Sequence, residues 1–256
     1  MTTPAPLLRF DGVICRFGEV TAVGGVSCDI AAGSFVALVG ASGSGKTTLL
    51  KTVNALVVPN EGRVLFGAED VSTLPPARLR RRIGYVFQGV GLFPHMSVAE
   101  NIAIGPRLAG ETLPPERIAE LLALVELDPD YARRMPDALS GGQRQRVGVA
   151  RALAGGPELL LMDEPFGALD PVTRDALGRT VRELHETLGL TTVMVTHDMA
   201  EALLLADRVL VMDAGRLVAD ESPRALLAGA GGAVAQRLVA VPREQAERLA
   251  AMEGPR

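Results

Sequence analysis

Aromatic residues are scarce in this chain of 256 residues, at 4% of the total, and tryptophan is absent. Aliphatic side chains and methionine must therefore fill the core, and a hydrophobic content of 48% is enough for one large domain or one domain with a small appendage. Long hydrophobic runs are also missing. No run approaches the ~18 apolar residues of a membrane-spanning helix, so the sequence predicts no membrane span.

Cysteine is nearly absent too, because Cys15 and Cys28 are the only two and neither lies in a Cys-x-x-Cys motif. We therefore expect a reduced, cytosolic protein with two free thiols. Met1 to Phe10 has no charged-then-apolar leader, which predicts that there is no secretion signal. The net charge is only −4, and the basic cluster from Arg78 to Arg82 fits a solvated helix face better than a nucleic-acid contact.

Short apolar segments alternate with helical patterns over most of the chain, which predicts an α/β fold with a mostly parallel central sheet. β-Prone pieces between Leu8 and Ile30 predict a small N-terminal antiparallel sheet. From about residue 90 to 137, helical patterns punctuated by prolines predict a helical insertion. We expect further strands at Ser34–Val39, Arg63–Phe66, Ile83–Phe87, Leu159–Met162, Thr191–Thr196 and Arg208–Met212, and helices at Thr47–Leu56, Pro115–Glu126, Gly142–Leu153, Pro171–Leu188 and Met199–Leu205.

A glycine-rich loop follows the first of these apolar strands and opens a helix. Its residues fit the G-x-x-x-x-G-K-[ST] pattern of a P-loop nucleoside triphosphatase. In that pattern, backbone N–H groups and the helix N-terminus bind phosphate, the lysine reaches the β and γ phosphates, and the hydroxyl after the lysine binds Mg²⁺. We therefore expect a nucleoside triphosphate to bind at Gly40, Ala41, Ser42, Gly43, Ser44, Gly45, Lys46, Thr47 and Thr48, with Thr47 as a metal ligand.

Two carboxylates, Asp163 and Glu164, end a second apolar strand. Ligands bind at the C-terminal edge of such sheets, so Asp163 is expected to hold Mg²⁺, directly or through water. Glu164 is expected to polarise the attacking water as a catalytic base. Without the glycine-rich loop, the same pair could simply cap the following turn.

The segment Leu139-Ser140-Gly141-Gly142-Gln143, directly before a helix, resembles the signature of the ABC ATPase family. On its own, Ser140 could be an ordinary helix N-cap. The resemblance extends from about residue 8 to 222 and implies the fold of that family, with ATP hydrolysis as its activity. It also implies that Ser140, Gly141, Gly142 and Gln143 close over the γ-phosphate bound to a second subunit. We thus expect a head-to-tail dimer with two ATP molecules at its interface.

Other positions match the family pattern as well. The resemblance implies that Gln88 senses Mg²⁺ and water and that His197 contacts the γ-phosphate, although a lone histidine after a strand is more often structural. It also implies that the loop Ala168-Leu169-Asp170 communicates across the dimer. Phe17 lies where the family places an aromatic side chain on adenine, and the alternative is a core phenylalanine at a strand end.

The resemblance divides the chain into an ABC ATPase domain over residues 1–222, with a helical subdomain at about 90–137, and a short C-terminal helical tail at 223–256. A single cassette with no fused membrane domain indicates a separate importer subunit. Its implied partners are transmembrane permease subunits and an extracytoplasmic solute-binding protein, which places it at the cytoplasmic face of the membrane, with no nucleic-acid partner.

The stretches Leu79–Ile102 and Val53–Leu56, the latter followed by Pro59 and Gly62, resemble the branch that imports osmoprotectants such as glycine betaine and choline. Three alternatives stay open. The first is an importer of another small solute, such as an amino acid, and the second is a non-transport ATPase acting on nucleic acid or ribosomes. The third, a binding module without catalysis, fits poorly because Lys46 and both carboxylates are present.

Overall fold

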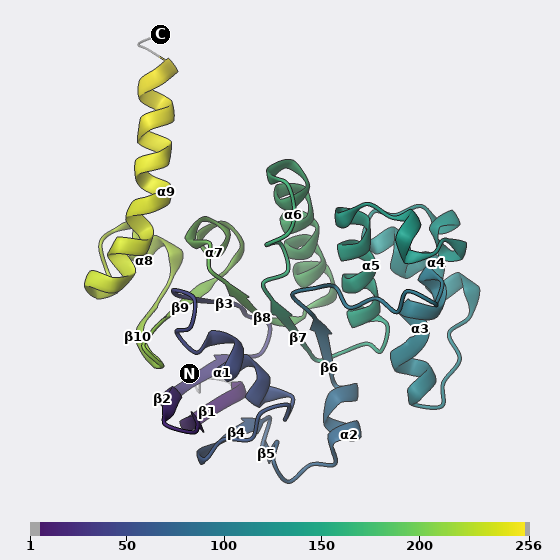
Figure 1. Cartoon of the computed structure of the whole chain (residues 1–256), viewed down its shortest axis with the longest axis horizontal. Helices are drawn as coiled ribbons and strands as arrows, with labels where there is room; N and C mark the ends of the chain where they lie inside the picture. Colours follow the sequence, from purple (N-terminus) through teal and green to yellow (C-terminus); the bar gives the residue numbers. More distant parts are fainter. Residues whose placement is uncertain (1–5, 254–256) are drawn as a thin grey trace.

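The computed structural model describes residues 6–253, which form two sheets with a helix layer between them and a second helix layer outside (Figure 1). The first sheet is antiparallel, in the order β2-β1-β4-β5. It contains the predicted N-terminal sheet, extended by two later strands. Its strands are β1 (Pro6–Phe17), β2 (Val20–Ala31), β4 (Glu61–Phe66) and β5 (Glu69–Asp70).

The second sheet has six strands in the order β10-β9-β3-β8-β7-β6, and all neighbours are parallel except β10 and β9. Every residue of its three central strands β3, β7 and β8 is buried, as expected for a sheet covered on both faces. The predicted α/β fold with a mostly parallel sheet is confirmed. The strands are β3 (Phe35–Val39), β6 (Ile83–Val86), β7 (Leu159–Asp163), β8 (Thr191–Thr196), β9 (Arg208–Asp213) and β10 (Arg216–Glu221).

Two separate cores lie on the two faces of this sheet. Strand β3 alternates between them, because Phe35, Ala37 and Val39 belong to one core and Val36 and Leu38 to the other. The core between the two sheets also holds the buried side of α1 (Lys46–Val53) and of α2 (Pro76–Arg81). The outer core holds α3 (Val98–Leu108), α4 (Pro115–Leu124), α5 (Gly141–Leu153), α6 (Pro171–Leu188) and α7 (Met199–Leu205). Helices α1 and α5 therefore lie on opposite faces of the sheet.

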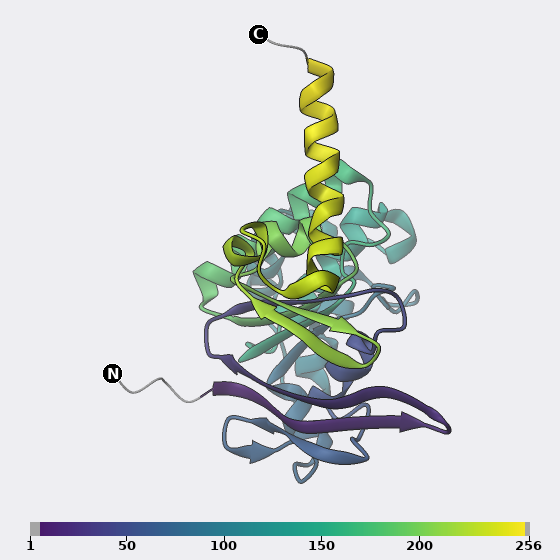
Figure 2. The same ribbon diagram turned by 90° about the vertical axis from the view of Figure 1, so that its left-hand side faces the viewer.

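The region from 90 to 137 contains α3, α4 and two 3-10 turns, Pro129–Arg133 and Pro136–Ala138. After residue 222 the chain forms α8 (Pro223–Leu227) and α9 (Gly232–Glu253). The first half of α9 packs on the outer core, and its second half projects from the body (Figures 1 and 2). No described helix is long and apolar enough to cross a membrane.

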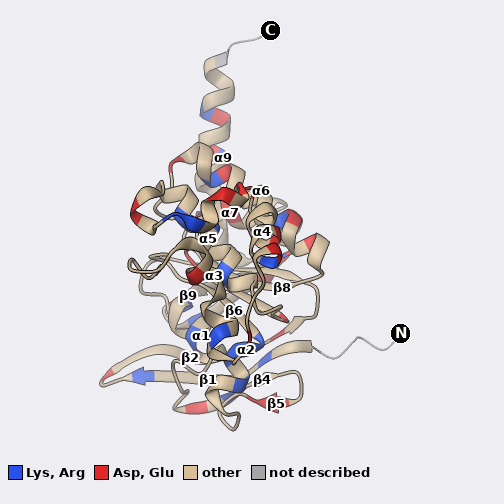
Figure 3. Cartoon of the chain, turned by 90° about the vertical axis from the view of Figure 1, so that its right-hand side faces the viewer, with Lys and Arg blue, Asp and Glu red and all other residues tan. Residues whose placement is uncertain are grey.

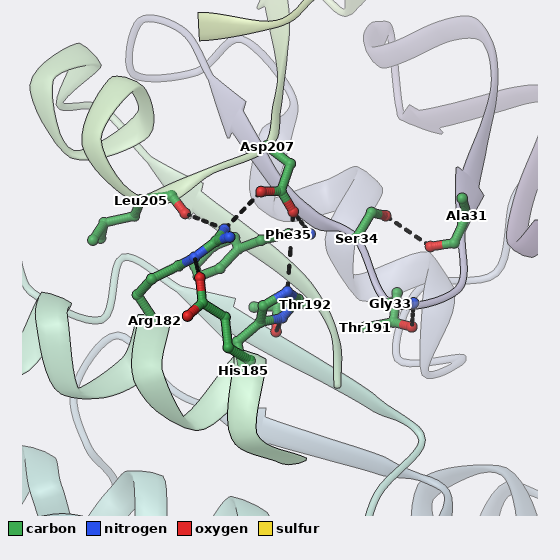
Figure 4. A network of polar contacts seen from close by, with 11 residues as sticks. Ala31, Gly33, Ser34, Phe35, Arg182, His185, Thr191, Thr192, Leu205 and Asp207 are labelled. Carbon is green, nitrogen blue, oxygen red and sulfur yellow. Dashed lines mark hydrogen bonds and ion pairs between the residues drawn. The ribbon is translucent and has the colours of Figure 1, made fainter. Parts of the chain in front are cut away.

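A polar network fixes the edge of the six-stranded sheet where its parallel strands begin (Figure 4). Asp207 accepts a hydrogen bond of 2.9 Å from the backbone N–H of Phe35 and one of 2.8 Å from Arg182 of α6. The buried His185 contacts the Thr192 hydroxyl at 3.1 Å. This edge is opposite to the one at which β3 enters the glycine-rich loop.

Charged residues of both signs are interspersed over the face that carries α3 to α6 (Figure 3). The basic cluster at Arg78–Arg82 lies on and just after α2, and most of it is engaged within the chain. Arg82 is paired with Glu69 and Glu158, and Arg80 donates to the backbone of Asn54.

Candidate active site

The glycine-rich loop connects the buried end of β3 to the first turn of α1. Gly45 is the N-cap of α1 with a φ of 99°, and a Cβ there would lie 2.2 Å from the carbonyl oxygen of Ala22. A Cβ at Gly40 would lie 2.2 Å from the carbonyl oxygen of Met212. Only glycine fits these two positions, because the loop backbone lies close to the backbone of Ala22 and Met212.

Lys46 is buried at the start of α1, with 5% of its surface exposed. Its ammonium donates hydrogen bonds of 2.8 Å to the carbonyls of Gly40 and Ala41, within its own loop. Burial lowers the pKa of Lys46, while the charges of Glu164 and Asp163 raise it. No side chain caps α1, so the N–H groups of its first turn are available to an anion.

Asp163 ends β7 and is held by two hydroxyl groups. Thr47 Oγ1 donates to one carboxylate oxygen at 2.9 Å, and the Tyr85 hydroxyl donates to the other at 3.2 Å. Burial and the charge of Asp163 raise the pKa of Tyr85, which keeps its hydroxyl protonated as a donor.

Glu164 lies between the two remaining predicted catalytic residues. Gln88 Nε2 donates to Glu164 Oε2 at 3.1 Å, and His197 Nδ1 lies 3.3 Å from the same oxygen. The Glu164 backbone has a φ of 45°, which is unusual outside glycine, and its N–H donates to the Val195 carbonyl of the neighbouring strand. Such strained positions concentrate at functional sites.

Four of these residues, Lys46, Thr47, Gln88 and Glu164, line one cavity of about 360 Å³. Asp163 and His197 are not part of its lining, but they contact Thr47 and Glu164, which are. A cavity of this size, lined by an ammonium group, hydroxyl groups and a carboxylate, suits the triphosphate group of a nucleotide. It is lined by Ala22, Ser42, Gly43, Gly45, Lys46, Thr47, Thr48, Gln88 and Glu164.

The donor set fits Mg²⁺. The hydroxyl of Thr47, the carboxylate of Asp163 and the amide oxygen of Gln88 are hard oxygen ligands, and the first two are already within 2.9 Å of each other. Among residues 6–253 there is no cluster of three or more His, Cys, Asp or Glu that could hold a metal. An ion bound here would thus depend on phosphate oxygens as further ligands, as Mg²⁺ in phosphoryl-transfer sites does.

The signature segment lies away from this cavity, at the start of α5 on the other face of the sheet. Ser140 and Gln143 form a reciprocal cap, in which the Gln143 N–H donates to Ser140 Oγ and the Ser140 N–H donates to Gln143 Oε1. Gly141 is exposed, and a Cβ there would meet nothing within 4 Å. At Gly142, in contrast, a Cβ would lie 2.4 Å from the Thr173 methyl group of α6. A side chain at position 142 would therefore have to displace the Thr173 side chain, apart from any role of Gly142 in phosphate binding.

Asp170 and Phe17 also lie outside the cavity lining. Asp170 caps α6 by accepting from the N–H groups of Val172 and Thr173, and hydrogen bonds to Thr173 and Val172 lower its pKa. Phe17 ends β1 with 55% of its surface exposed. A core position for Phe17 is excluded, and the exposed ring is free to stack on a ligand.

Three contacts around the site were not predicted from the sequence. Tyr85 supports Asp163, Thr173 packs on Gly142, and Tyr131 accepts a hydrogen bond of 2.9 Å from Gln143. A further difference concerns the strand expected at Ile83–Phe87, directly before Gln88. Strand β6 stops at Val86, so Gln88 lies in the loop beyond it.

Comparison with known proteins agrees with this geometry. A family model described as ABC transporter matches residues 23–167. The glycine betaine/carnitine/choline transport ATP-binding protein OpuCA of Bacillus subtilis is 49% identical over 212 residues, which cover 82% of this chain and 56% of that protein. The sulfate/thiosulfate import ATP-binding protein CysA of Xylella fastidiosa (strain 9a5c) is 50% identical over 222 residues, which cover 84% and 63%.

The chain thus spans little more than half the length of OpuCA. Among solved structures, the dimeric post-hydrolysis state of the ATP-binding cassette MJ0796 bound to ADP and Pi superimposes with a TM-score of 0.76 at 33% identity. That match covers 85% of this chain and 99% of the cassette. The family model alone matches more than half of the chain, so the chain belongs to the ABC transporter family of ATP-binding cassettes.

Proposed function

We propose that this chain is the ATP-hydrolysing subunit of an ABC importer for osmoprotectants such as glycine betaine or choline. The observation that carries the ATPase activity is the cavity that joins Lys46 and Thr47 to Gln88 and Glu164. The similarity to OpuCA supports the transport role and the cargo.

The phosphates of ATP would bind at the loop from Gly40 to Thr48, where Lys46 and the open N-terminus of α1 supply positive charge. Glu164 would accept a proton from the attacking water, and His197, 3.3 Å from Glu164, would orient that water and contact the γ-phosphate. Phosphoryl transfer depends mainly on such positioning and on charge neutralisation.

Thr47, Gln88 and Asp163 would hold Mg²⁺ together with the nucleotide. When bound, the ion neutralises charge on the phosphate oxygens. The hydroxyl groups of Thr47 and Tyr85 would keep the Asp163 carboxylate oriented for binding the ion.

A homodimer explains the residues that lie outside the cavity. Ser140–Gln143 form an anion-binding helix start, but α5 and α1 lie on opposite faces of the sheet, so a second copy of the chain would supply this surface to each nucleotide. Asp170 would lie at the same interface, and the exposed ring of Phe17 would stack on adenine. The dimeric state of the MJ0796 cassette supports this arrangement.

A groove beside Gln88 suits a helix of the permease. It has a volume of about 400 Å³ and is lined by Phe87, Gly91, Phe93, Ile104, Leu108 and Arg151. Three of its apolar side chains, Phe87, Phe93 and Leu108, are between 41% and 77% exposed, which is costly unless another surface covers them. A permease docked here would place the chain at the cytoplasmic face of the membrane, with a solute-binding protein on the opposite side.

The cargo is open to a second candidate. CysA, which carries sulfate/thiosulfate import in its name, is as similar to this chain as OpuCA is. An importer of another small solute is therefore the alternative, since the proposed site recognises ATP and not the transported molecule.

The test is to purify the tagged chain from its native membranes in mild detergent and to identify what accompanies it. A multi-span permease supports the importer, and a solute-binding protein that binds glycine betaine or choline supports the cargo. A binding protein specific for sulfate would favour the alternative, and recovery with nucleic acid or ribosomes would refute transport. The variant Leu108→Glu should lose the permease, whereas Leu249→Glu, equally apolar and 67% exposed on α9, should keep it.

A further inference from the structure

Arg174, one turn into α6, lies between the loop that ends in Asp170 and the loop that carries His197. Its Nη2 donates to the Leu169 carbonyl at 3.2 Å. Its Nη1 lies 3.5 Å from the Asp198 carboxylate, and its Nε lies 3.7 Å from the Glu201 carboxylate. A single guanidinium group therefore contacts both loops.

The groups that Arg174 contacts also hold both neighbours of His197 in the chain. The Asp198 N–H donates to Thr196 Oγ1 at 3.0 Å, and Thr196 Oγ1 donates to Glu201 at 2.6 Å. Asp198 caps α7 by accepting from the Ala200 N–H at 2.8 Å. Since these groups hold both flanking residues, a displacement of Asp198 or Glu201 would shift the backbone on either side of His197.

Helices α6 and α7 pack on each other beside a cavity. The two helices contact each other at Gly178, where a Cβ would meet Leu205 Cδ1 at 3.3 Å. This contact borders a cavity of about 420 Å³, which Arg174, Asp198 and Glu201 also line. Ionic contacts of Arg174 therefore connect α6 to α7 and to the loop before it at the wall of this cavity.

The distance between Arg174 Nε and the Glu201 carboxylate is longer than that of a hydrogen bond. Arg174 Nε is buried and makes no hydrogen bond, because Glu201 lies just beyond hydrogen-bond distance. A movement of roughly 0.5 Å would bring the pair to an N–H···O distance. The link responds to small shifts of either loop.

We propose that Arg174 is a positioning residue that transmits the position of the Ala168–Asp170 loop to His197 and so sets the orientation of His197 against Glu164. This inference rests on the proposed function, because it assigns His197 and Glu164 to the hydrolytic step. Arg174 touches neither the glycine-rich loop nor the cavity lining around Lys46, so it acts on turnover and not on nucleotide affinity.

The experiment measures kcat and KM for ATP, together with nucleotide affinity and melting temperature, in the full chain and three variants. Arg174→Ala should lower kcat by about 10- to 100-fold, the size expected from a small misplacement of a catalytic group, with an unchanged KM. Arg174→Lys should recover part of kcat, because it keeps the charge but not the planar fork. Arg179→Ala is the matched control: Arg179 lies on the same helix, its side chain is 67% exposed, and among residues 6–253 it pairs with Asp175 alone.

The decisive measurement repeats Arg174→Ala in a His197→Ala chain. If Arg174 acts through His197, its removal has no further effect on kcat there. An equal loss in both backgrounds, a loss carried by KM, or the same loss in Arg179→Ala overturns the proposal. A wild-type chain that hydrolyses ATP beside an unaffected Arg174→Ala variant refutes the role of Arg174 alone and leaves the proposed function standing.

Discussion

Substituting Gly142 by alanine should destabilise the fold through one methyl group. The new Cβ would lie 2.4 Å from Thr173 Cγ2, well below the 3.0 Å under which side chains must shift. Overpacking of this kind costs about 3 kcal/mol at the upper end of its usual range. Replacing glycine in a helix returns roughly 0.5–1 kcal/mol. The expected net loss is about 2 kcal/mol, or a fall in melting temperature of about 4–8 °C for a chain of this length.

The clash between a Cβ at position 142 and the Thr173 methyl group can be removed while Asp170 still caps α6. Thr173→Ser deletes the offending methyl group and keeps the hydroxyl whose hydrogen bond lowers the pKa of Asp170. The nearest Thr173 atoms to a Cβ at Gly142 would then be Cβ at 3.7 Å and the hydroxyl at 3.9 Å, which is ordinary contact. In that background Gly142→Ala should be neutral or stabilising by up to about 1 kcal/mol.

The wild-type chain, Gly142→Ala, Thr173→Ser and the double variant form a double-mutant cycle. Their chemical denaturation gives the coupling energy between Gly142 and Thr173, which we expect to be about 2–3 kcal/mol. Gly141→Ala serves as the control, because it is the adjacent residue on α5 and its Cβ would meet nothing. An equal loss of stability from Gly142→Ala with and without the Thr173 methyl group would refute the steric argument.

Three further predictions follow from single side chains. Glu164→Gln should leave ATP affinity intact and reduce turnover by at least ~100-fold, as for a positioned proton acceptor; near-normal turnover would remove it from that role. Arg151→Met deletes bonds of 2.5 and 2.6 Å to the carbonyls of Val90 and Gly91 and should lower the free energy of unfolding by about 1.5–3 kcal/mol in urea titrations. Burial lowers the pKa of His185, so the unfolded chain binds a proton that the folded chain rejects, and the melting temperature should fall from about pH 7 to pH 5. His185→Asn should flatten that slope.

Local chemistry explains which parts of the fold could be predicted. The bounds of α6 and β8 agree with the sequence, because proline and glycine bracket the helix and every residue of the strand is buried. Strand β10 was missed, since only Ala219 of its six residues is buried and its charged residues resemble a loop. Phe87 was assigned to β6 because it is apolar, but it is 45% exposed and lines the groove beyond the strand.

In the site, too, local sequence patterns could be predicted, whereas contacts that depend on strand pairing could not. The loop from Gly40 to Thr48 is continuous in sequence, so its cavity could be predicted from the residues alone. Tyr85 could not, because its contact with Asp163 depends on the pairing of β6 with β7, which places Tyr85 opposite Leu161 and two residues from Asp163. The sequence alone does not show how β6 and β7 are aligned.

The first turns of α6 connect segments of the site that lie far apart in sequence. Thr173 packs on Gly142 at the start of α5, and the next residue, Arg174, contacts both Leu169 and Asp198. In the proposed dimer the start of α5 would contact the nucleotide of the other copy, so a displacement caused by that nucleotide would act on α6 through Thr173. Because Arg174 lies one residue further along a rigid helix, that displacement reaches His197 through two side-chain contacts. We therefore expect hydrolysis at one site to depend on occupancy of the other, and Thr173→Ser to weaken this dependence without changing nucleotide affinity.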